Sequence, residues 1–319
     1  MNVFEYSFLT LAVFLLLQVA TTGAAPNVEH SLFANGPKII NGTDAIRNNT
    51  MHQVSLRRRL SDSYFFGTGH ICGASLISYT MVLSAAHCFV NFDSENYTYI
   101  TARDFIVVMG NLNRFEKNNY TLIYDITHVV YRTQQFNISN YYQDIALVFL
   151  NGTVPANHPT VHPIVINSKP VAPGTICQIT GWGKTEEDYL SDVLKTLDVP
   201  IISNQVCSNE TGFDPGYILE GMMCAGYMEG ERDACNGDSG GPMVCNGFLA
   251  GIISWGDGCA LPNLPGVYTD VAFYAPWIRS NVLAAGGNLG DSAMSSCRES
   301  LLLLIALVTI TTWLSRRRQ

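Results

Sequence analysis

The sequence Asp233-Ala234-Cys235-Asn236-Gly237-Asp238-Ser239-Gly240-Gly241-Pro242 decides how the rest of the chain is interpreted. Ser239 has glycines close by on both sides. Such a serine can sit on a tight turn whose backbone N–H groups point at the atom that its hydroxyl attacks. Ser239 is therefore a candidate nucleophile.

A serine nucleophile needs a histidine as its general base, and chain order limits where that histidine can be. The same letters match the Gly-x-Ser-x-Gly turn of the α/β-hydrolases, in which an acidic residue and then a histidine follow the serine. The last histidine of this chain is His162. The α/β-hydrolase interpretation is therefore excluded, and the partner histidine must precede Ser239.

His87 is the candidate base, because it follows the apolar run Met81 to Ser84 and is held by the neighbouring Cys88. Asp144 enters another apolar run, where a lone buried carboxylate would be costly unless it were paired. We expect His87, Asp144 and Ser239 to form a catalytic triad. The alternative is that His87 is a buried histidine and Asp144 a capping residue.

The composition limits the classes of function. The 319 residues are 47% apolar and 14% charged, which is sufficient for a substantial core. The formal charge of -8 and the absence of a basic reading motif argue against a nucleic-acid partner. The nine cysteines include no Cys-x-x-Cys pair, so zinc ribbons and thioredoxin-type sites lack their spacing. We expect structural disulfides and no metal or cofactor.

The N-terminal region indicates export. The apolar run from Phe8 to Ala20, followed by small residues, predicts a signal peptide over residues 1–24, and it is too short for the alternative of a membrane anchor. The polar residues 25–38 are expected to form a flexible leader. Glycan sequons, which are meaningful only in the secretory pathway, begin at Asn41, Asn48, Asn96, Asn119, Asn137, Asn151 and Asn209.

The middle of the chain predicts β-structure. Short runs rich in β-branched residues recur between turn signals, and no convincing helical period precedes Ala272, so we expect an all-β sandwich or barrel. A helix is expected near Phe273 to Leu283, with Pro276 in its first turn. The predicted strands are Ile71 to Ile77, Met81 to Ser84, Phe105 to Met109, Ile145 to Leu150, Thr175 to Thr180, Phe248 to Ser254 and Gly266 to Thr269.

The C-terminal region has two interpretations. Residues 286–300 form a polar linker, and residues 301–319 contain an apolar run followed by three arginines. As a helix the run Leu301 to Leu314 would span roughly 21 Å, short of the ~30 Å hydrocarbon core. It is either a glycolipid-anchor signal that is removed or a short transmembrane segment with a basic flank.

Five motifs together resemble the chymotrypsin-like, trypsin-type serine endopeptidases, in that family's order. They are Ala85-Ala86-His87-Cys88, Asp144-Ile145-Ala146-Leu147, Gly181-Trp182-Gly183, Gly237-Asp238-Ser239-Gly240-Gly241-Pro242 and Ser254-Trp255-Gly256. The resemblance implies two six-stranded antiparallel β-barrels with a C-terminal helix, over residues 39–285.

The resemblance also implies a mechanism. Ser239 would attack the scissile carbonyl, His87 would accept and return the proton, and Asp144 would fix the imidazole tautomer. The N–H groups of Gly237 and Ser239 would form the oxyanion hole.

Activation is implied by the junction Lys38-Ile39-Ile40-Asn41-Gly42. Cleavage after Lys38 would free the ammonium of Ile39, which would pair with the buried carboxylate of Asp238. Residues 25–38 would then be an activation propeptide. Asn41 stands where the family has glycine, and a glycan there would hinder cleavage or insertion.

Specificity is implied by Asp233, six residues before Ser239. By resemblance its carboxylate lies at the base of the primary pocket and favours Arg or Lys in the substrate. Ala234 lacks the hydroxyl of many trypsins, so we expect Arg to be preferred over Lys. Ser254, Trp255, Gly256 and Gly266 would line the pocket, and the two glycines would leave it open.

The resemblance pairs eight of the cysteines. The implied disulfides are Cys72 with Cys88, Cys177 with Cys245, Cys207 with Cys224, and Cys235 with Cys259. Cys297 is left over beside the apolar tail.

Three weaker features are expected to be structural. His158 and His162 have a spacing that suits a metal on a helix, but Pro159 and Pro163 prevent a helix, so we expect a solvated loop. The segment from Gly110 to Asn119 has too little acidic charge to hold calcium. We expect the run Arg57-Arg58-Arg59 to lie in a solvated loop at the rim of the active site, where it could also select acidic substrate residues.

The sequence thus predicts a secreted or surface-anchored, zymogen-activated endopeptidase. Its expected partners are protein or peptide substrates with Arg or Lys, an activating protease, protein inhibitors and, through the tail, a membrane. Two alternatives remain: a catalytically silent homologue that binds partners through the same scaffold, and a surface adhesion or receptor protein.

Overall fold

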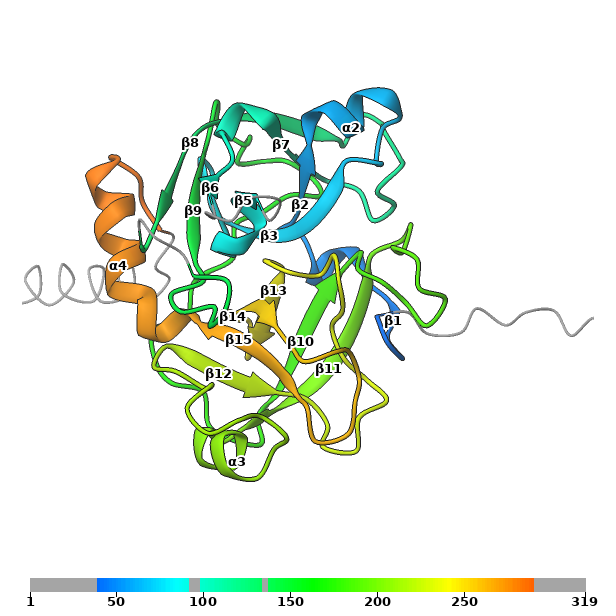
Figure 1. The fold of residues 1–319 in the computed structure, drawn as a ribbon. Helices are drawn as coiled ribbons and strands as arrows, with labels where there is room; N and C mark the ends of the chain where they lie inside the picture. Colours follow the sequence, from blue (N-terminus) through cyan, green and yellow to red (C-terminus); the bar gives the residue numbers. More distant parts are fainter. Residues whose placement is uncertain (1–38, 92–97, 134–136, 290–319) are drawn as a thin grey trace, which may run out of the picture. The chain divides into compact units, whose positions relative to one another are not determined.

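The computed structural model describes residues 39–91, 98–133 and 137–289, and these residues form two antiparallel β-barrels (Figure 1). The predicted signal peptide, the propeptide with Lys38, most of the linker, the C-terminal tail, Asn96 and Cys297 lie outside the described residues.

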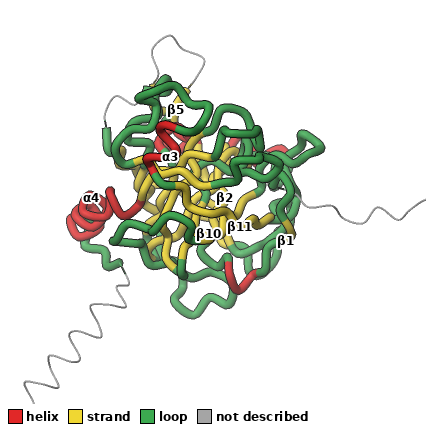
Figure 2. The backbone as a smooth tube through the Cα atoms, turned by 90° about the horizontal axis from the view of Figure 1, so that it is seen from below, coloured by secondary structure: helices red, strands yellow, loops and turns green. Residues whose placement is uncertain are grey.

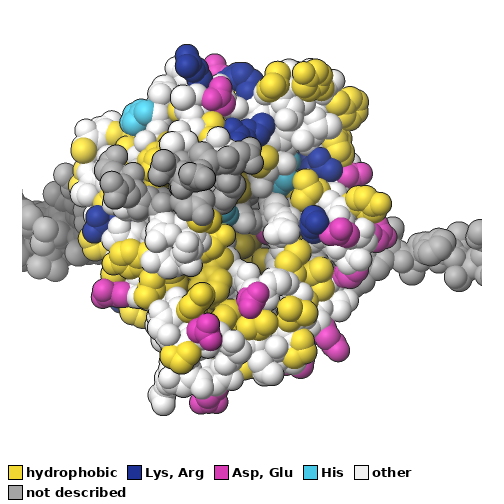
Figure 3. All heavy atoms as spheres, viewed as in Figure 1, with side chains coloured by type: hydrophobic (Ala, Val, Ile, Leu, Met, Phe, Trp, Pro, Cys, Tyr) yellow, Lys and Arg dark blue, Asp and Glu magenta, His cyan; other side chains and the backbone are white. Residues whose placement is uncertain are grey.

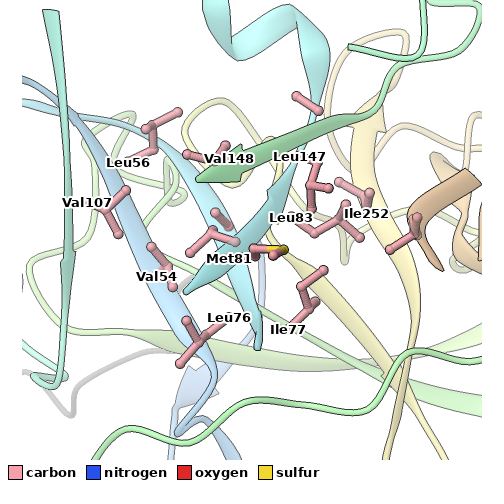
Figure 4. Close-up of a cluster of buried hydrophobic side chains, with 14 of the residues drawn as sticks. Val54, Leu56, Leu76, Ile77, Met81, Leu83, Val107, Leu147, Val148 and Ile252 are labelled. Atoms are coloured by element: carbon pink, nitrogen blue, oxygen red, sulfur yellow. The ribbon is translucent and has the colours of Figure 1, made fainter. Parts of the chain in front are cut away.

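The first barrel is closed, with the strand order β2-β3-β4-β9-β8-β7. Its strands are β2 (Gln53–Arg58), β3 (His70–Ser78), β4 (Met81–Ser84), β7 (Phe105–Met109), β8 (Leu122–Tyr131) and β9 (Ala146–Leu150). Alternate side chains of these strands point inward and fill the interior, because successive residues of a strand face opposite sides of the sheet. Figure 4 shows Val54, Leu56, Leu83, Val107 and Leu147 converging in this core.

The second barrel is a sheet with the order β1-β11-β10-β13-β14-β15-β12, in which β12 also pairs with β11 and closes a ring of six strands. Its strands are β1 (Thr43–Asp44), β10 (Ile176–Gly181), β11 (Lys195–Ile202), β12 (Met222–Ala225), β13 (Pro242–Cys245), β14 (Phe248–Trp255) and β15 (Gly266–Asp270). Two further short strands, β5 (Val90–Asn91) and β6 (Thr98–Tyr99), pair with each other. The predicted fold of two six-stranded barrels is therefore confirmed.

The helices are few and lie at the periphery of the two barrels (Figure 2). The helices are α2 (Arg59–Tyr64), α3 (Asn204–Asn209) and α4 (Val271–Ala284), together with 3₁₀ turns at Arg47–Asn49, Ala86–Phe89 and Ala102–Asp104. Among these residues, no helix has the length and apolar character needed to cross a membrane.

The helix predicted near the C-terminus is present, but it begins two residues early. Asp270 caps it by accepting hydrogen bonds from the N–H groups of Ala272 and Phe273. Pro276 consequently lies inside α4 and not in its first turn, which corrects the prediction. Tyr274, Ile278 and Val282 of α4 pack into the core cluster of the first barrel.

Seven strands lie where the sequence predicted them, with each end within one residue, whereas the other described strands, among them the long strands β2, β8 and β11, were not predicted. β2 was missed because it contains the arginines that were expected in a solvated loop. The expected solvated loop is wrong: Arg57 and Arg58 are strand residues, Arg59 begins α2, and the side chain of Arg57 is 2% exposed. Arg58 nevertheless lines the cleft described below, as its expected place near the active site implied.

The expected loop around His158 and His162 is confirmed, since no helix forms there, but the expected solvation is wrong for His158, which is 8% exposed. Burial lowers its pKa, with a smaller effect from the nearby His162. The imidazole ring of His158 is therefore packed against the protein, although the segment that carries it is a loop.

Candidate active site

A cleft of about 420 Å³ lies where loops of the two barrels meet. His87 and Cys88 line it from the first barrel, and Asp233 to Gly237, Ser239 and the end of β14 line it from the second. Figure 3 shows that hydrophobic side chains gather on the lower part of this face, below the first barrel. The residues that line the cleft come from segments far apart in the sequence, between Arg58 and Tyr268.

His87 is held in the 3₁₀ turn that follows β4. Its Nδ1 lies 2.8 Å from Oδ2 of Asp144, and its backbone N–H donates to Oδ1 of the same carboxylate at 2.9 Å. Because an ionised carboxylate can only accept, Nδ1 carries the ring proton and Nε2 keeps a free lone pair. Nε2 is the atom that could accept a proton from a nucleophile.

Asp144 is 1% exposed and is satisfied by several donors. Besides His87, the hydroxyl of Ser254 donates to Oδ2 at 2.5 Å, and the hydroxyl of Thr269 donates to the backbone carbonyl at 2.7 Å. Buried carboxylates are tolerated when they are hydrogen-bonded in this way. The strands β14 and β15 therefore fix Asp144 against His87.

Ser239 lies on the turn before β13 and lines the same cleft as His87. Its carbonyl accepts the N–H of Gly73 at 2.8 Å, and the next N–H, that of Gly240, donates to Ile253 at 2.7 Å. These bonds attach the serine to strands of both barrels.

The N–H groups of Gly237 and Ser239 donate to no acceptor within the described ranges. Gly237 has a φ of +97°, in the left-handed region that other residues rarely adopt. Two unpaired N–H groups on one tight turn are suited to binding an oxyanion.

Asp233 lines the cleft and is 4% exposed. Its Oδ1 accepts the N–H of Ala234 at 2.8 Å and its Oδ2 that of Ala260 at 3.1 Å. Burial raises the pKa of Asp233 to about 6, although these two bonds lower it. A cation entering the cleft would relieve the cost of the buried charge.

Glycine at position 266 keeps the Asp233 carboxylate accessible. A Cβ atom on Gly266 would lie 3.0 Å from Asp233 Oδ1 and 3.1 Å from the ring of Tyr268. Ala234, Ser254, Trp255 and Gly256 line the same cleft. The structure thus brings together all of the residues predicted to bind substrate.

Asp238 is fully buried, and burial raises its pKa to about 7. Oδ1 accepts the N–H of Gly183 at 2.7 Å and Oδ2 that of Cys235 at 2.9 Å. No basic side chain of the described residues forms an ion pair with it. Ile39 is 0% exposed and packs in the core cluster that contains Tyr268. Besides burial, the charge of Asp238 contributes to raising the pKa of the Tyr268 hydroxyl, so Tyr268 lies near both Ile39 and Asp238.

Comparison with known proteins gives the family. The model of the trypsin family matches residues 39–278. The chain belongs to the trypsin family. It is 40% identical to trypsin eta of Drosophila melanogaster over 245 residues, which are 76% of this chain and 87% of that protein. It is 37% identical to serine protease 1 of Homo sapiens over 273 residues (85% and 97%), and 35% identical to trypsin-1 of Gadus morhua over 253 residues (79% and 94%).

Membership of the trypsin family makes the chain a serine endopeptidase, a hydrolase of peptide bonds. The predicted family and the predicted class of enzyme are therefore confirmed.

Four disulfides join the cysteines in the pairs that the resemblance to this family implied. They are Cys72–Cys88, Cys177–Cys245, Cys207–Cys224 and Cys235–Cys259. Such bonds form in oxidising compartments. Cys72–Cys88 holds β3 next to His87, and Cys235–Cys259 ties the segment before Ser239 to the loop after β14.

Sequence reasoning missed several residues of this trypsin-family site. Tyr141 lies edge-on to His87, with ring centroids 5.6 Å apart, and lines the cleft. Ser254 was expected only as a pocket residue, yet it also binds Asp144. No sequence signal points to Tyr141, because its loop has no motif and only the tertiary structure brings it to His87.

Proposed function

We propose that this chain is a zymogen-activated endopeptidase that cleaves after arginine, and less readily after lysine, with Ser239, His87 and Asp144 as its catalytic triad. The observation that carries the substrate class is Asp233. It is a buried carboxylate that faces the cleft of Ser239 and His87 and pairs with no basic side chain of the described residues. A guanidinium offers two parallel donors to a carboxylate, which a single ammonium does not.

The reaction follows from the arrangement of donors and acceptors. The Oγ of Ser239 forms a bond to the scissile carbonyl carbon while its proton passes to Nε2 of His87. The N–H groups of Gly237 and Ser239 hold the oxyanion. His87 then gives the proton to the leaving amine, and a water molecule hydrolyses the acyl-enzyme by the same route in reverse.

Lysine is expected to be the poorer substrate because of Ala234. An ammonium needs acceptors around a point charge, and the methyl group of Ala234 supplies none beside Asp233. Arginine can satisfy its fork with the carboxylate itself.

Activation is proposed to follow cleavage between Lys38 and Ile39. The new ammonium of Ile39 would pair with Asp238, whose carboxylate is buried beside the nucleophile without a counter-charge among the described residues. In the uncleaved chain Asn41 is exposed, and its amide donates to the carbonyl of Glu231 at 3.0 Å. A glycan would be attached to the same amide nitrogen. It would crowd the contact with Glu231, which lies two residues before Asp233.

We propose the following organisation: a signal peptide at 1–24, an activation propeptide at 25–38, the protease at 39–285, a linker at 286–300 and a hydrophobic tail at 301–319. The protein would be secreted and held at the outer cell surface, either by a glycolipid attached when the tail is removed or by the tail itself as a short transmembrane segment. An activating protease and protein inhibitors are its proposed partners, besides substrates.

The test is cleavage of matched fluorogenic peptides that end in Arg, Lys or Phe. The full chain would be purified in mild detergent and assayed before and after cutting at Lys38 with immobilised trypsin, which is then removed. N-terminal sequencing would verify the new end at Ile39. The expected result is activity in the order Arg, Lys, Phe, only after cutting, and none in Ser239→Ala.

Absence of activity in a chain with a verified Ile39 terminus would overturn the proposal. It would assign the protein to the catalytically silent homologues.

A further inference from the structure

A hydrogen-bonded chain of buried polar groups lies behind the candidate oxyanion hole. It begins at Arg57, whose side chain is 2% exposed, passes through Ser55 and His70, and ends at the carbonyl of Gly237. Ser55 and Arg57 lie on the same face of β2, and His70 is the cross-strand neighbour of Arg57 on β3, at a β-bulge between Leu56 and Arg57. Bulges commonly redirect a side chain near an active site.

The distances are those of direct hydrogen bonds. Arg57 Nε lies 2.9 Å from Ser55 Oγ, and Ser55 Oγ lies 2.8 Å from His70 Nδ1. His70 Nε2 lies 3.1 Å from the carbonyl oxygen of Gly237. Gly237 is also the residue whose N–H group is proposed to hold the oxyanion.

The chemistry of the two ends sets the direction of every bond. A guanidinium can only donate and a carbonyl can only accept. Since Arg57 donates to Ser55, the single hydroxyl proton of Ser55 is free to go to His70 Nδ1. His70 then carries its own proton on Nε2 and donates it to Gly237.

The surroundings keep His70 neutral, as this direction requires. Burial lowers the pKa of His70 to about 3; the bond to the Gly237 carbonyl raises it by less, and the cations of Arg57 and Arg114 lower it further. A neutral imidazole has one donor and one acceptor, which match a carbonyl on one side and a hydroxyl on the other.

Arg57 is itself held by a counter-charge in α2, the helix that follows β2. Its Nη1 lies 3.1 Å from Asp62 Oδ1, and its Nη2 donates to the carbonyl of Arg114 at 2.8 Å. Asp62 also accepts the N–H of Gly67 at 2.8 Å. The guanidinium therefore has partners on each of its three nitrogens.

We infer that Arg57 is a positioning residue for the oxyanion hole, acting through Ser55 and His70 to hold the carbonyl of Gly237 and hence the turn that presents the N–H groups of Gly237 and Ser239. This inference rests on the proposed function, because it takes Gly237 as an oxyanion donor.

Without Arg57, His70 could adopt its other tautomer, with the ring proton on Nδ1. Ser55 could then accept from His70 Nδ1, which would leave Nε2 without a proton opposite the Gly237 carbonyl. Two acceptors would face each other, and the Gly237–Asp238 peptide, which lies between the two proposed oxyanion donors, would lose the bond that holds it. Because the oxyanion forms only during the reaction, the loss should appear in kcat more than in KM.

Two variants test this in the full chain cut after Lys38. Arg57→Met with Asp62→Asn removes the ion pair without leaving a buried charge, and the Asn oxygen can still accept the Gly67 N–H. Ser55→Ala interrupts the chain while Arg57 keeps Asp62. Thr68→Val is the control, because the Thr68 hydroxyl donates to the carbonyls of Ser61 in α2 and Phe65 just after it, and not to Arg57, Ser55 or His70.

The readouts are kcat, KM and the affinities of two inhibitors. A peptidyl boronate ending in Arg forms a tetrahedral adduct that uses the oxyanion hole, whereas benzamidine occupies only the Asp233 pocket. We expect Arg57→Met/Asp62→Asn to lose about tenfold in kcat and in boronate affinity, less than the 100-fold or more for a lost oxyanion donor. Ser55→Ala should lose less than twofold, because it offers Nδ1 no acceptor and His70 keeps its proton on Nε2 opposite Gly237. Benzamidine affinity should change by less than twofold, and Thr68→Val should match the parent protein.

Combining the two variants separates positioning from general stability. If Arg57 acts through Ser55, Arg57→Met/Asp62→Asn should cause no further loss of kcat in the Ser55→Ala background. A tenfold loss that persists in the Ser55→Ala background, unchanged kcat in Arg57→Met/Asp62→Asn alone, or equal weakening of boronate and benzamidine would overturn the inference. If the Arg57 variant does not fold, a tenfold loss of kcat in Ser55→Ala alone overturns it. The proposed function fails separately, through an inactive parent protein.

Discussion

At the scale of single residues, Asp233 combines three properties that determine what the cleft binds. It is buried, its carboxylate is held by two backbone N–H groups, and it faces the cleft that contains Ser239 and His87. A cation in this position replaces the water that the carboxylate has lost, whereas an apolar group would leave the charge unpaired.

Replacement of Asp233 by Ser should therefore remove selectivity for arginine. We expect kcat/KM for an Arg peptide to fall by a factor on the order of 10³, since breaking a buried pair costs about 3–5 kcal/mol. The rate on the matched Phe peptide should not fall. Steady-state kinetics on both peptides would measure this, and unchanged cleavage after Arg would show that another residue forms the base of the pocket.

Benzamidine binding should depend on pH through the same residue. Burial raises the pKa of Asp233 to about 6, so its carboxyl group is ionised at pH 7 and mostly protonated at pH 5. The affinity for the cation should fall about tenfold from pH 7 to pH 5. Calorimetric titration of the Ser239→Ala protein would measure this, and a flat profile would contradict the assignment.

At the scale of elements, α4 depends on its cap. Asp270 accepts the first free N–H groups of the helix, and α4 packs three large side chains onto the first barrel. Asp270→Ala should destabilise the protein by about 1 kcal/mol, as removal of an N-cap usually does.

Asp270→Asn is the matched control for the cap. Burial raises the pKa of Asp270, so the ionised form is disfavoured and a neutral amide should cap as well. Urea unfolding at pH 7 would compare the variants. Equal loss in Asn and Ala would show that the charge, and not the capping oxygen, is what matters.

The disulfides allow a second comparison at this scale. Cys235–Cys259 and Cys207–Cys224 close segments of similar length, with sequence separations of 24 and 17. Replacing either pair by Ser should cost about 3 kcal/mol of stability. Only loss of Cys235–Cys259 should also weaken benzamidine binding, because both of its cysteines line the cleft.

Unfolding by urea and benzamidine titration would distinguish the two pairs. Equal loss of benzamidine affinity in both variants would mean that the disulfide next to Ser239 has no specific effect on the pocket.

At the scale of the whole molecule, buried carboxylates link stability to pH. In the uncleaved chain the pKa of Asp238 is raised to about 7 and that of Asp233 to about 6, both by burial. Between pH 4 and pH 7 the folded state therefore binds more protons than the unfolded state, and stability falls as the pH rises. At about 1.4 kcal/mol per pKa unit the change amounts to a few kcal/mol.

Cleavage after Lys38 should reduce this loss. An ammonium at Ile39 paired with Asp238 would lower the pKa of that carboxyl group and leave Asp233 as the main contributor. Urea midpoints of cleaved and uncleaved Ser239→Ala protein at pH 4.5 and pH 7 would measure it. Parallel pH profiles for the two forms would contradict the pairing.

The two barrels show how far local pattern predicts a fold. Met81–Ser84 and Phe105–Met109 are strands over the same residues that their apolar pattern predicted. β2 and β11 were missed because they carry Arg57 and Pro200, residues that locally argue against a buried strand. Arg57 is compatible with burial only because Asp62 and Ser55 are folded against it.

By itself, the sequence determined the chemistry of this protein: a serine on a glycine-rich turn, a histidine beside a cysteine, a buried aspartate, and the motifs of the trypsin family. These signals are local: each consists of a few consecutive residues and is recognisable without knowledge of the fold. Only the tertiary structure decided that Asp144 is held by Ser254 as well as His87, that Tyr141 lies against His87, and that Arg57 connects to Gly237. The physical reason is that these contacts join segments far apart in the chain, and the closure and packing of two barrels set their distances.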